Sequence, residues 1–199
     1  LDGEGVGLYA IYKTAKGSYF GATAKYTRCS FDEIKGTQMG SGKSFNGEYD
    51  TDAYGLSFVA GKRIAKDQQK GFYVEPQAEL AYVNYGSDKY DLDGMDVEVN
   101  SMKSLRARLG LQIGSRNISK KTFSDIYAKV SFLHEFFGDN DINMGAYTYE
   151  SDQGGSWVNF ALGFSVGSMD KFNANFSANL SRGSHKSKVG FKTVLNFLY

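Results

Sequence analysis

Large apolar and polar residues alternate along much of this chain, most plainly in its last segment. From position 187 onward the apolar, aromatic or β-branched positions are Val189, Phe191, Thr193, Leu195, Phe197 and Tyr199. The positions between them include Lys188, Gly190, Lys192 and Asn196. Because successive side chains of a β-strand point to opposite faces, the first set shares one face and the second set shares the other. A strand with one apolar and one polar face is typical of a transmembrane β-barrel.

The same alternation predicts nine strands along the chain. They cover residues 4–13, 18–31, 51–62, 71–85, 103–114, 123–136, 156–167, 171–182 and 187–199. Most are longer than the roughly 5–6 residues usual in soluble sheets. They match the roughly 9–11 residues with which a tilted strand crosses a bilayer. We therefore predict an all-β fold, a transmembrane antiparallel β-barrel whose apolar face meets lipid.

A soluble lipocalin-like barrel or β-sandwich is the main structural alternative. Such a protein would bury the apolar face and expose a polar face rich in Lys, Glu and Thr. Here the polar faces are rich in Gly, Ser, Asn and Gln, as in the segment 171–182. The pattern therefore favours lipid outside and water inside.

Composition supports the barrel and excludes other classes. The 199 residues include 14 Tyr, 15 Phe and 24 Gly but one Pro, which suits long uninterrupted strands with interfacial aromatic residues. Mean hydropathy is −0.40, and no stretch of about 18 apolar residues exists to form a membrane helix. The net charge of +1 gives no reason to expect a nucleic-acid partner. Cys29 has no second cysteine with which to form an intrachain disulfide.

The connections between the predicted strands alternate in length. Those around 14–17, 63–70, 115–122 and 168–170 are short, whereas those around 32–50, 86–102 and 137–155 are long and rich in Gly, Asp, Asn and Ser. Barrels of the bacterial outer membrane have short periplasmic turns and long extracellular loops. The short link 183–186 breaks the pattern. If Tyr199 lies in the periplasm, nine strands place Leu1 outside the cell, so we expect further strands upstream.

Two pairs of opposite charges share the polar face of adjacent predicted strands. Glu75 and Glu79 lie on one strand, and Arg106 and Arg108 lie on the next. They are expected to form a polar network in the lumen, which either stiffens the wall or contacts a polypeptide inside it. Inward glycines could leave room for such a guest or could allow the strands to bend: Gly21, Gly55, Gly61, Gly110, Gly114, Gly163 and Gly167.

Signals for catalysis or metal binding are weak. His134 and His185 are the chain's histidines, and His134 has outward parity near a strand end. The run Gly40–Ser44 lacks the spacing and the strand-to-helix context of a phosphate loop. Asp139, Asn140 and Asp141 lack a calcium-loop motif. We expect no cofactor and no metal site.

Three segments together resemble a known family. Residues 71–82 (GFYVEPQAELAY) are similar to the Glu-Pro-Gln strand of autotransporter (type V secretion) β-domains. Residues 104–111 (SLRARLGL) resemble the strand that follows it, and residues 127–139 contain the His-Glu-Phe and Gly-Asp that come next. The segments 52–56 and 7–9 and the aromatic terminus also fit, with the order preserved.

The resemblance implies a twelve-stranded outer-membrane barrel with a linker helix in its lumen and a secreted passenger upstream. Residues 1–199 would then be a partial translocator domain holding the fourth to twelfth strands, without the helix and the passenger. Its partners would be the lipid bilayer, the outer-membrane β-barrel assembly machinery and its own passenger, and it would not be an enzyme. The expected recognition signal of the terminal strand is Val189, Phe191, Leu195, Phe197 and Tyr199, which also suit a purely lipid-facing role. A porin-like or structural barrel and an outer-membrane hydrolase remain as alternatives.

Overall fold

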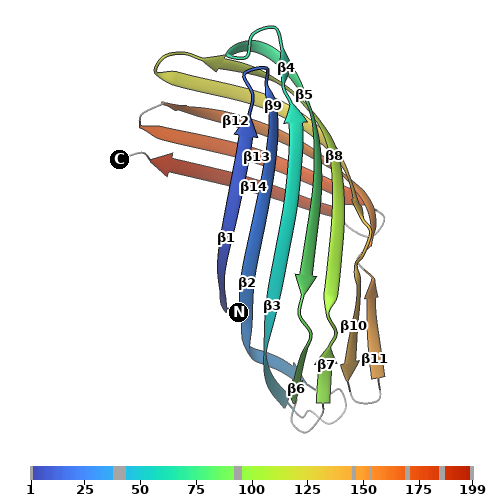
Figure 1. Cartoon of the computed structure of the whole chain (residues 1–199). Coiled ribbons are helices and arrows are strands. Elements are labelled where there is room, and N and C mark those ends of the chain that lie inside the picture. Colours follow the sequence, from blue (N-terminus) through green and yellow to red (C-terminus); the bar gives the residue numbers. More distant parts are fainter. Residues whose placement is uncertain are drawn as a thin grey trace.

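The described part of the chain consists of β-strands joined by turns (Figure 1). This computed structural model describes residues 2–37, 44–91, 96–144, 147–152, 154–168, 171–183 and 187–197. Its main element is an antiparallel sheet in which nine long strands follow one another in chain order. They are β1 (Asp2–Lys13), β2 (Ser18–Thr37), β3 (Ser44–Lys62), β5 (Lys70–Tyr85), β8 (Met102–Ile118), β9 (Thr122–Glu135), β12 (Gly155–Ser168), β13 (Phe172–Gly183) and β14 (Ser187–Phe197). The short β4 (Ile64–Ala65) also pairs with β5.

Each of the nine predicted segments overlaps one of these long strands, so the all-β antiparallel prediction is confirmed. The pairing register carries the alternation from strand to strand. Phe160 lies opposite Leu180, and Leu180 lies opposite Val189, so apolar side chains form rows across the sheet. No helix in the described ranges is long and apolar enough to cross a membrane.

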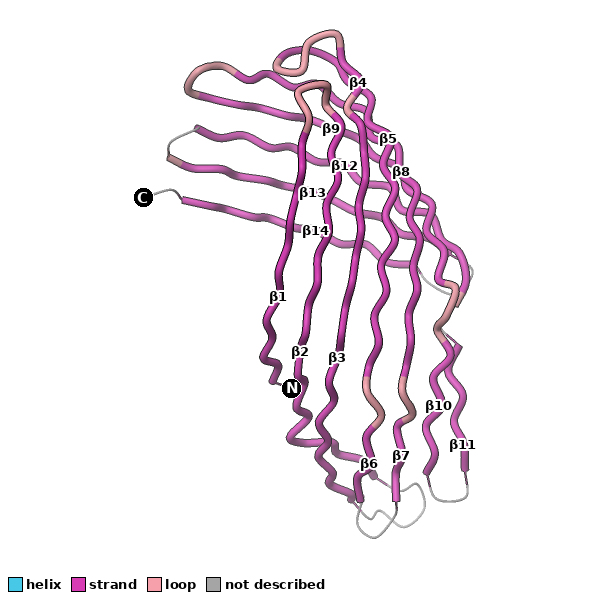
Figure 2. Tube along the Cα trace, in the orientation of Figure 1, coloured by secondary structure: helices cyan, strands magenta, loops and turns pink. Residues whose placement is uncertain are grey.

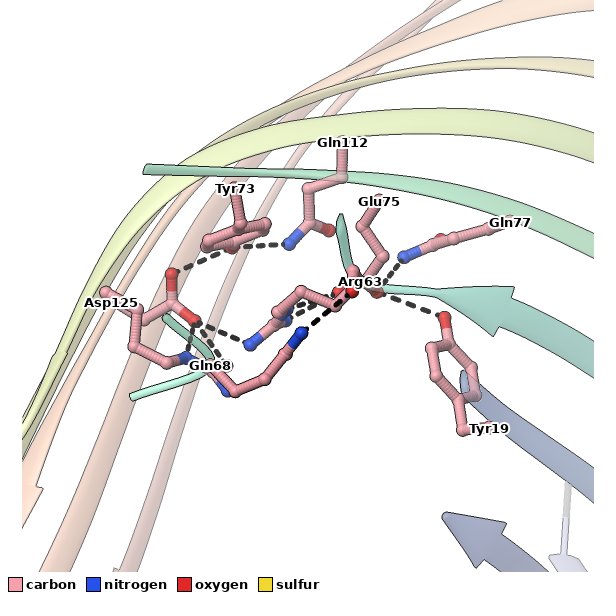
Figure 3. Close-up of polar contacts among 9 residues, drawn as sticks. Tyr19, Arg63, Gln68, Tyr73, Glu75, Gln77, Gln112 and Asp125 are labelled. Atoms are coloured by element: carbon pink, nitrogen blue, oxygen red, sulfur yellow. Dashed lines mark hydrogen bonds and ion pairs between the residues drawn. The ribbon is translucent and has the colours of Figure 1, made fainter. Parts of the chain in front are cut away.

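The two faces of the sheet differ in chemistry. We call the face that carries Leu80, Leu109 and Phe164 the outer face, and these side chains are 46%, 64% and 42% exposed. The opposite, inner face carries Glu75 and Asp125, which are buried. The strands curve around this inner face, and its polar side chains project into the curve (Figure 3). The apolar side chains therefore line the outside of the sheet, as the sequence predicts, and do not pack into a protein core.

Two connections that the sequence presents as loops contain strands. Residues 86–102 include β6 (Asp88–Asp91) and β7 (Asp96–Val99), and residues 137–155 include β10 (Asp139–Met144) and β11 (Tyr147–Asp152). They form a second sheet in the order β11-β10-β7-β6, beyond the ends of β5 and β8 (Figure 2). The loop prediction was wrong here because β7 pairs with β10, a strand of a different connection, and such long-range pairing leaves no local pattern.

The second sheet buries at least one apolar side chain. Val97 of β7 is 1% exposed, and burial raises the pKa of the Tyr90 hydroxyl above its ordinary value. The sheet is tied to the main sheet at its base, where the Gly86 N–H donates to the Asp52 carbonyl oxygen at 2.7 Å. The long connections are thus partly ordered extensions of the main sheet.

β1 and β14 occupy the two edges of the main sheet, and no described pairing joins them. Because nine strands alternate in direction, β1 and β14 run the same way and point toward the end that carries the short turns. An antiparallel bond between them is therefore impossible. The nine long strands described here therefore leave two edges without a described pairing partner.

Candidate functional site: the inner face of the sheet

Four arginine side chains of the inner face each pair with a carboxylate. The pairs are Arg63–Glu75, Arg106–Glu135, Arg108–Glu79 and Arg116–Asp125. The distance from Arg63 Nη2 to Glu75 Oε2 is 2.6 Å, and that from Arg116 Nε to Asp125 Oδ2 is 2.8 Å. Three of the carboxylates, those of Glu75, Asp125 and Glu135, are buried. A buried carboxylate is tolerated only when it is paired and hydrogen-bonded, so the folded sheet requires these arginine partners.

Asp125 is the centre of one cluster (Figure 3). The Tyr73 hydroxyl donates to Asp125 Oδ1 at 2.8 Å, while Arg116 donates to the other oxygen. Gln112 Nε2 donates to the Tyr73 hydroxyl at 2.8 Å. The guanidinium of Arg63 lies over the Tyr73 ring, 4.1 Å from its centroid, which adds a cation–π contact. The cluster therefore ties together β5, β8, β9 and the turn that follows β3.

Glu75 is the centre of the adjoining cluster. Its Oε1 accepts hydrogen bonds from the Tyr19 hydroxyl at 3.1 Å and from Gln77 Nε2 at 2.8 Å. Its Oε2 accepts from Arg63 Nε at 2.7 Å. Gln68 Nε2 in turn donates to the Arg63 carbonyl oxygen, so the turn between β4 and β5 lies against the same cluster. A charged network thus braces the short-turn end of the inner face.

The four charged residues expected to form the network lie on the inner face, but they pair differently from the simplest expectation. Arg108 pairs with Glu79 and also donates to Gln77, which connects it to Glu75. Arg106 pairs with Glu135 of β9, and Glu75 pairs with Arg63. Arg106 lies directly opposite Glu135, and Arg108 lies directly opposite Glu79, so the pairing register decides these two partners, whereas Arg63 reaches Glu75 from a turn.

Sequence reasoning missed four charged residues of the network: Arg63, Arg116, Asp125 and Glu135. Asp125 and Glu135 have inward parity in the predicted segment 123–136, so their parity could have identified them. Arg116 lies two residues beyond the predicted segment 103–114. Arg63 lies in a turn, where periodicity gives no side-chain direction.

Several inward glycines lie beneath an aromatic ring of the preceding strand. Tyr19 lies opposite Gly61, Tyr73 opposite Gly114 and Tyr127 opposite Gly163. A Cβ added at any of these glycines would meet the tyrosine ring. These glycines therefore leave space for a tyrosine ring of the neighbouring strand. The sequence alone indicates strand bending or room for a polypeptide in the lumen, and it does not predict this role.

Replacing Gly114 with valine is expected to destabilise the folded protein by about 2 kcal/mol, because the new side chain collides with the wall. An added Cβ would lie 2.6 Å from Tyr73 Cζ and 2.6 Å from the Ile126 carbonyl oxygen. The measurement is the temperature at which the folded band is lost in semi-native electrophoresis. Gly190→Val is the matched control, since a Cβ there meets nothing within 4 Å. Equal losses in both variants would contradict the packing explanation.

The terminal strand β14 places its expected signal residues on the outer face. Val189, Phe191, Leu195 and Phe197 pair in register with Leu180, Ala178, Ala174 and Phe172 of β13. Phe191 is 84% exposed. Tyr199 lies outside the described residues. These apolar side chains therefore stand on a free edge strand, accessible both to lipid and to a pairing partner.

The other candidate groups show no catalytic arrangement. His134 has its Nδ1 2.8 Å from Ser156 Oγ and packs edge-on against Phe136 on the outer face. His185 and residues 40–43 of the Gly40–Ser44 run lie outside the described residues, as do the side chains of Asp139 and Asn140. Within the described ranges, no three His, Cys, Asp or Glu side chains gather closely enough to hold a metal ion.

Comparison with known proteins identifies the family. The family model described as "Autotransporter beta-domain" matches residues 1–179. The chain belongs to the autotransporter β-domain family. Pertactin autotransporter of Bordetella parapertussis is 31% identical to this β-domain over 168 residues, which are 83% of this chain and 18% of that protein. Autotransporter adhesin/invasin TibA of Escherichia coli O78:H11 is 26% identical over 168 residues, which are 82% of this chain and 16% of that protein.

A solved structure gives the same fold. The β-domain of the Bordetella autotransporter BrkA superposes with a TM-score of 0.75 at 20% identity, covering 99% of this chain and 72% of that one. The present β-domain spans less than a fifth of the length of the curated relatives that it matches. It is an outer-membrane translocator domain, as the sequence predicts. The comparisons give no support to a porin or a hydrolase.

Proposed function

We propose that this β-domain forms most of the wall of a channel through which its own upstream passenger reaches the cell surface. The observation that carries the proposal is the contrast between the two faces. The outer face exposes Leu109 and other apolar side chains, as a lipid-facing wall requires, while buried ion pairs such as Arg116–Asp125 line the inner face. A polypeptide in transit would meet a hydrated polar surface.

The proposed role includes no bond-making chemistry and no cofactor. In support, each inward carboxylate whose side chain the structure describes is engaged by an arginine, so none of these has the free, activated form that a general base needs. His134 contacts Ser156, but the pair faces outward and no carboxylate is bonded to it among the described residues. Any activity of the whole protein would then belong to its passenger.

We further propose that residues 1–199 act as a single unit, whose two free edges are completed by strands from upstream in the same polypeptide. The matched BrkA chain extends beyond the region that this β-domain covers, which supports the idea. Insertion would begin at β14, whose unpaired edge can add to a strand of the β-barrel assembly machinery through main-chain hydrogen bonds. The apolar side chains Val189, Phe191, Leu195, Phe197 and Tyr199 would supply the specificity.

Surface exposure of the passenger tests the proposed function. The complete gene product is expressed in an outer membrane, and protease is added to intact cells. The upstream segment is expected to be digested while the folded β-domain survives as a heat-modifiable band. Removal of residues 187–199 is expected to abolish both results. A folded β-domain whose upstream segment stays protected inside the cell would refute the proposal.

A further inference from the structure

The positive charges of the inner face fall into two groups. Arg63, Arg106, Arg108 and Arg116 are each paired with one of the four inward carboxylates whose side chains the structure describes. The inward lysines form no ion pair with a described residue: Lys13, Lys25, Lys129, Lys188 and Lys192. The inner face therefore has an excess of positive charge that the wall itself does not balance.

These lysines are inward by register. Lys129 lies opposite Gln112, which bonds to the inward Tyr73, and Lys192 lies opposite Ser177 in the row of Gly163. Lys25 lies opposite Gly55 in the row of Val83. Lys129 passes over Gly110, where an added Cβ would lie 3.6 Å from its Cε. The inward lysines without a described ion pair thus come from β1, β2, β9 and β14, at both edges and in the middle of the main sheet.

The lysines also lie at different heights along the strands. Lys13 ends β1 at the short-turn end, whereas Lys188 is the second residue of β14 at the opposite end. Lys129 lies between these levels, near the middle of β9. A small anion would meet one of these charges at a time. A polypeptide with carboxylates spaced along its length could meet several at once, and unpaired lysines near low-dielectric walls attract such a segment over a distance of about 10 Å.

We propose that the inner face is a binding surface for an acidic polypeptide segment, the part of the upstream chain that occupies the lumen during or after export. This inference rests on the proposed function, because it assigns a chemistry to the segment that the channel holds. The free lysines guide and hold the segment, while the arginine–carboxylate pairs keep the wall rigid. A lysine suits this role, because its flexible stem can follow a moving partner.

Charge reversal tests the proposal. The triple variant Lys25→Glu, Lys129→Glu and Lys192→Glu, made in the complete gene product, changes attraction to repulsion at three levels. The protease-accessible passenger, normalised to the folded β-domain, is expected to fall roughly tenfold, the sum of several weak exposed pairs. The matched control reverses three exposed lysines in turns outside the strands: Lys66, Lys120 and Lys171. The control is expected to export normally, and equal export by both variants would overturn the proposal.

A second measurement needs no variant and so does not depend on folding. The purified, complete protein is placed in a planar bilayer, and its current is recorded with a glutamate-rich peptide, with a lysine-rich peptide of equal length, or with inorganic phosphate. Block by the glutamate-rich peptide alone supports the proposal. Equal block by both peptides, or by phosphate, overturns it in favour of simple occlusion or a general anion site. Export failure in the wild-type protein would instead refute the proposed function.

Discussion

Replacing Phe191 with lysine is expected to reduce sharply the amount of folded β-domain in the outer membrane. Phe191 lies on the outer face near the middle of β14, in the row of Ala178 and Leu162. A lysine facing lipid near the bilayer midplane costs about 2 kcal/mol or more. The same change removes a large apolar side chain from the edge strand that is expected to pair first with the assembly machinery. The measurement is the fraction of protein that runs as a heat-modifiable band in isolated outer membranes.

Gly190→Lys is the control for this prediction, because it adds the same charge one residue away. Gly190 faces inward, and an added Cβ meets nothing within 4 Å, so the lysine can extend into the lumen. Its yield is expected to stay close to that of the unmodified protein. The pair Phe197→Lys and Asn196→Lys should repeat the contrast near the strand end. Comparable yields on the two faces would rule out the assignment of the outer face to lipid.

Replacing Asp125 with alanine is expected to lower the free energy of unfolding by about 3 kcal/mol, because it leaves the half-buried Arg116 without its counter-charge and the buried Tyr73 hydroxyl without its acceptor. Asp125 accepts bonds from Tyr73 and Arg116 and lies 4.0 Å from Arg63 Nη1, so β5, β8 and the turn after β3 lose a common partner. The measurement is urea unfolding of the protein folded into lipid vesicles.

Asp50→Ala removes an ion pair of similar geometry from an exposed site. Arg28 and Asp50 are 2.9 Å apart, but their side chains are 61% and 52% exposed. The expected loss is about 0.5 kcal/mol, as for other surface pairs. Equal losses of unfolding free energy in the two variants would show that burial does not explain the stabilisation by the inner network.

The alternation of apolar and polar residues was enough to locate the long strands, because lipid and water, the environments of their two faces, differ so strongly in polarity. One face of each strand contacts lipid and the other contacts water, so alternation persists through the central parts of β5, β8 and β12. In the structure Glu75, Glu79, Arg106 and Arg108 share one face of the sheet, which is the parity that alternation gives them. Alternation failed at β6, β7, β10 and β11, whose few residues gain their order from pairing between separate connections.

The sequence by itself therefore determined the number of long strands, their two faces and the family to which they belong, since local alternation and motif order carry that information. Only the tertiary structure decided which side chains form hydrogen bonds, ion pairs and ring contacts with one another. It selected Glu135 as the partner of Arg106, brought Arg63 from a turn onto Tyr73, and placed tyrosine rings over Gly61, Gly114 and Gly163. These contacts depend on pairing register, sheet curvature and rotamers across strands far apart in sequence, which no single strand specifies.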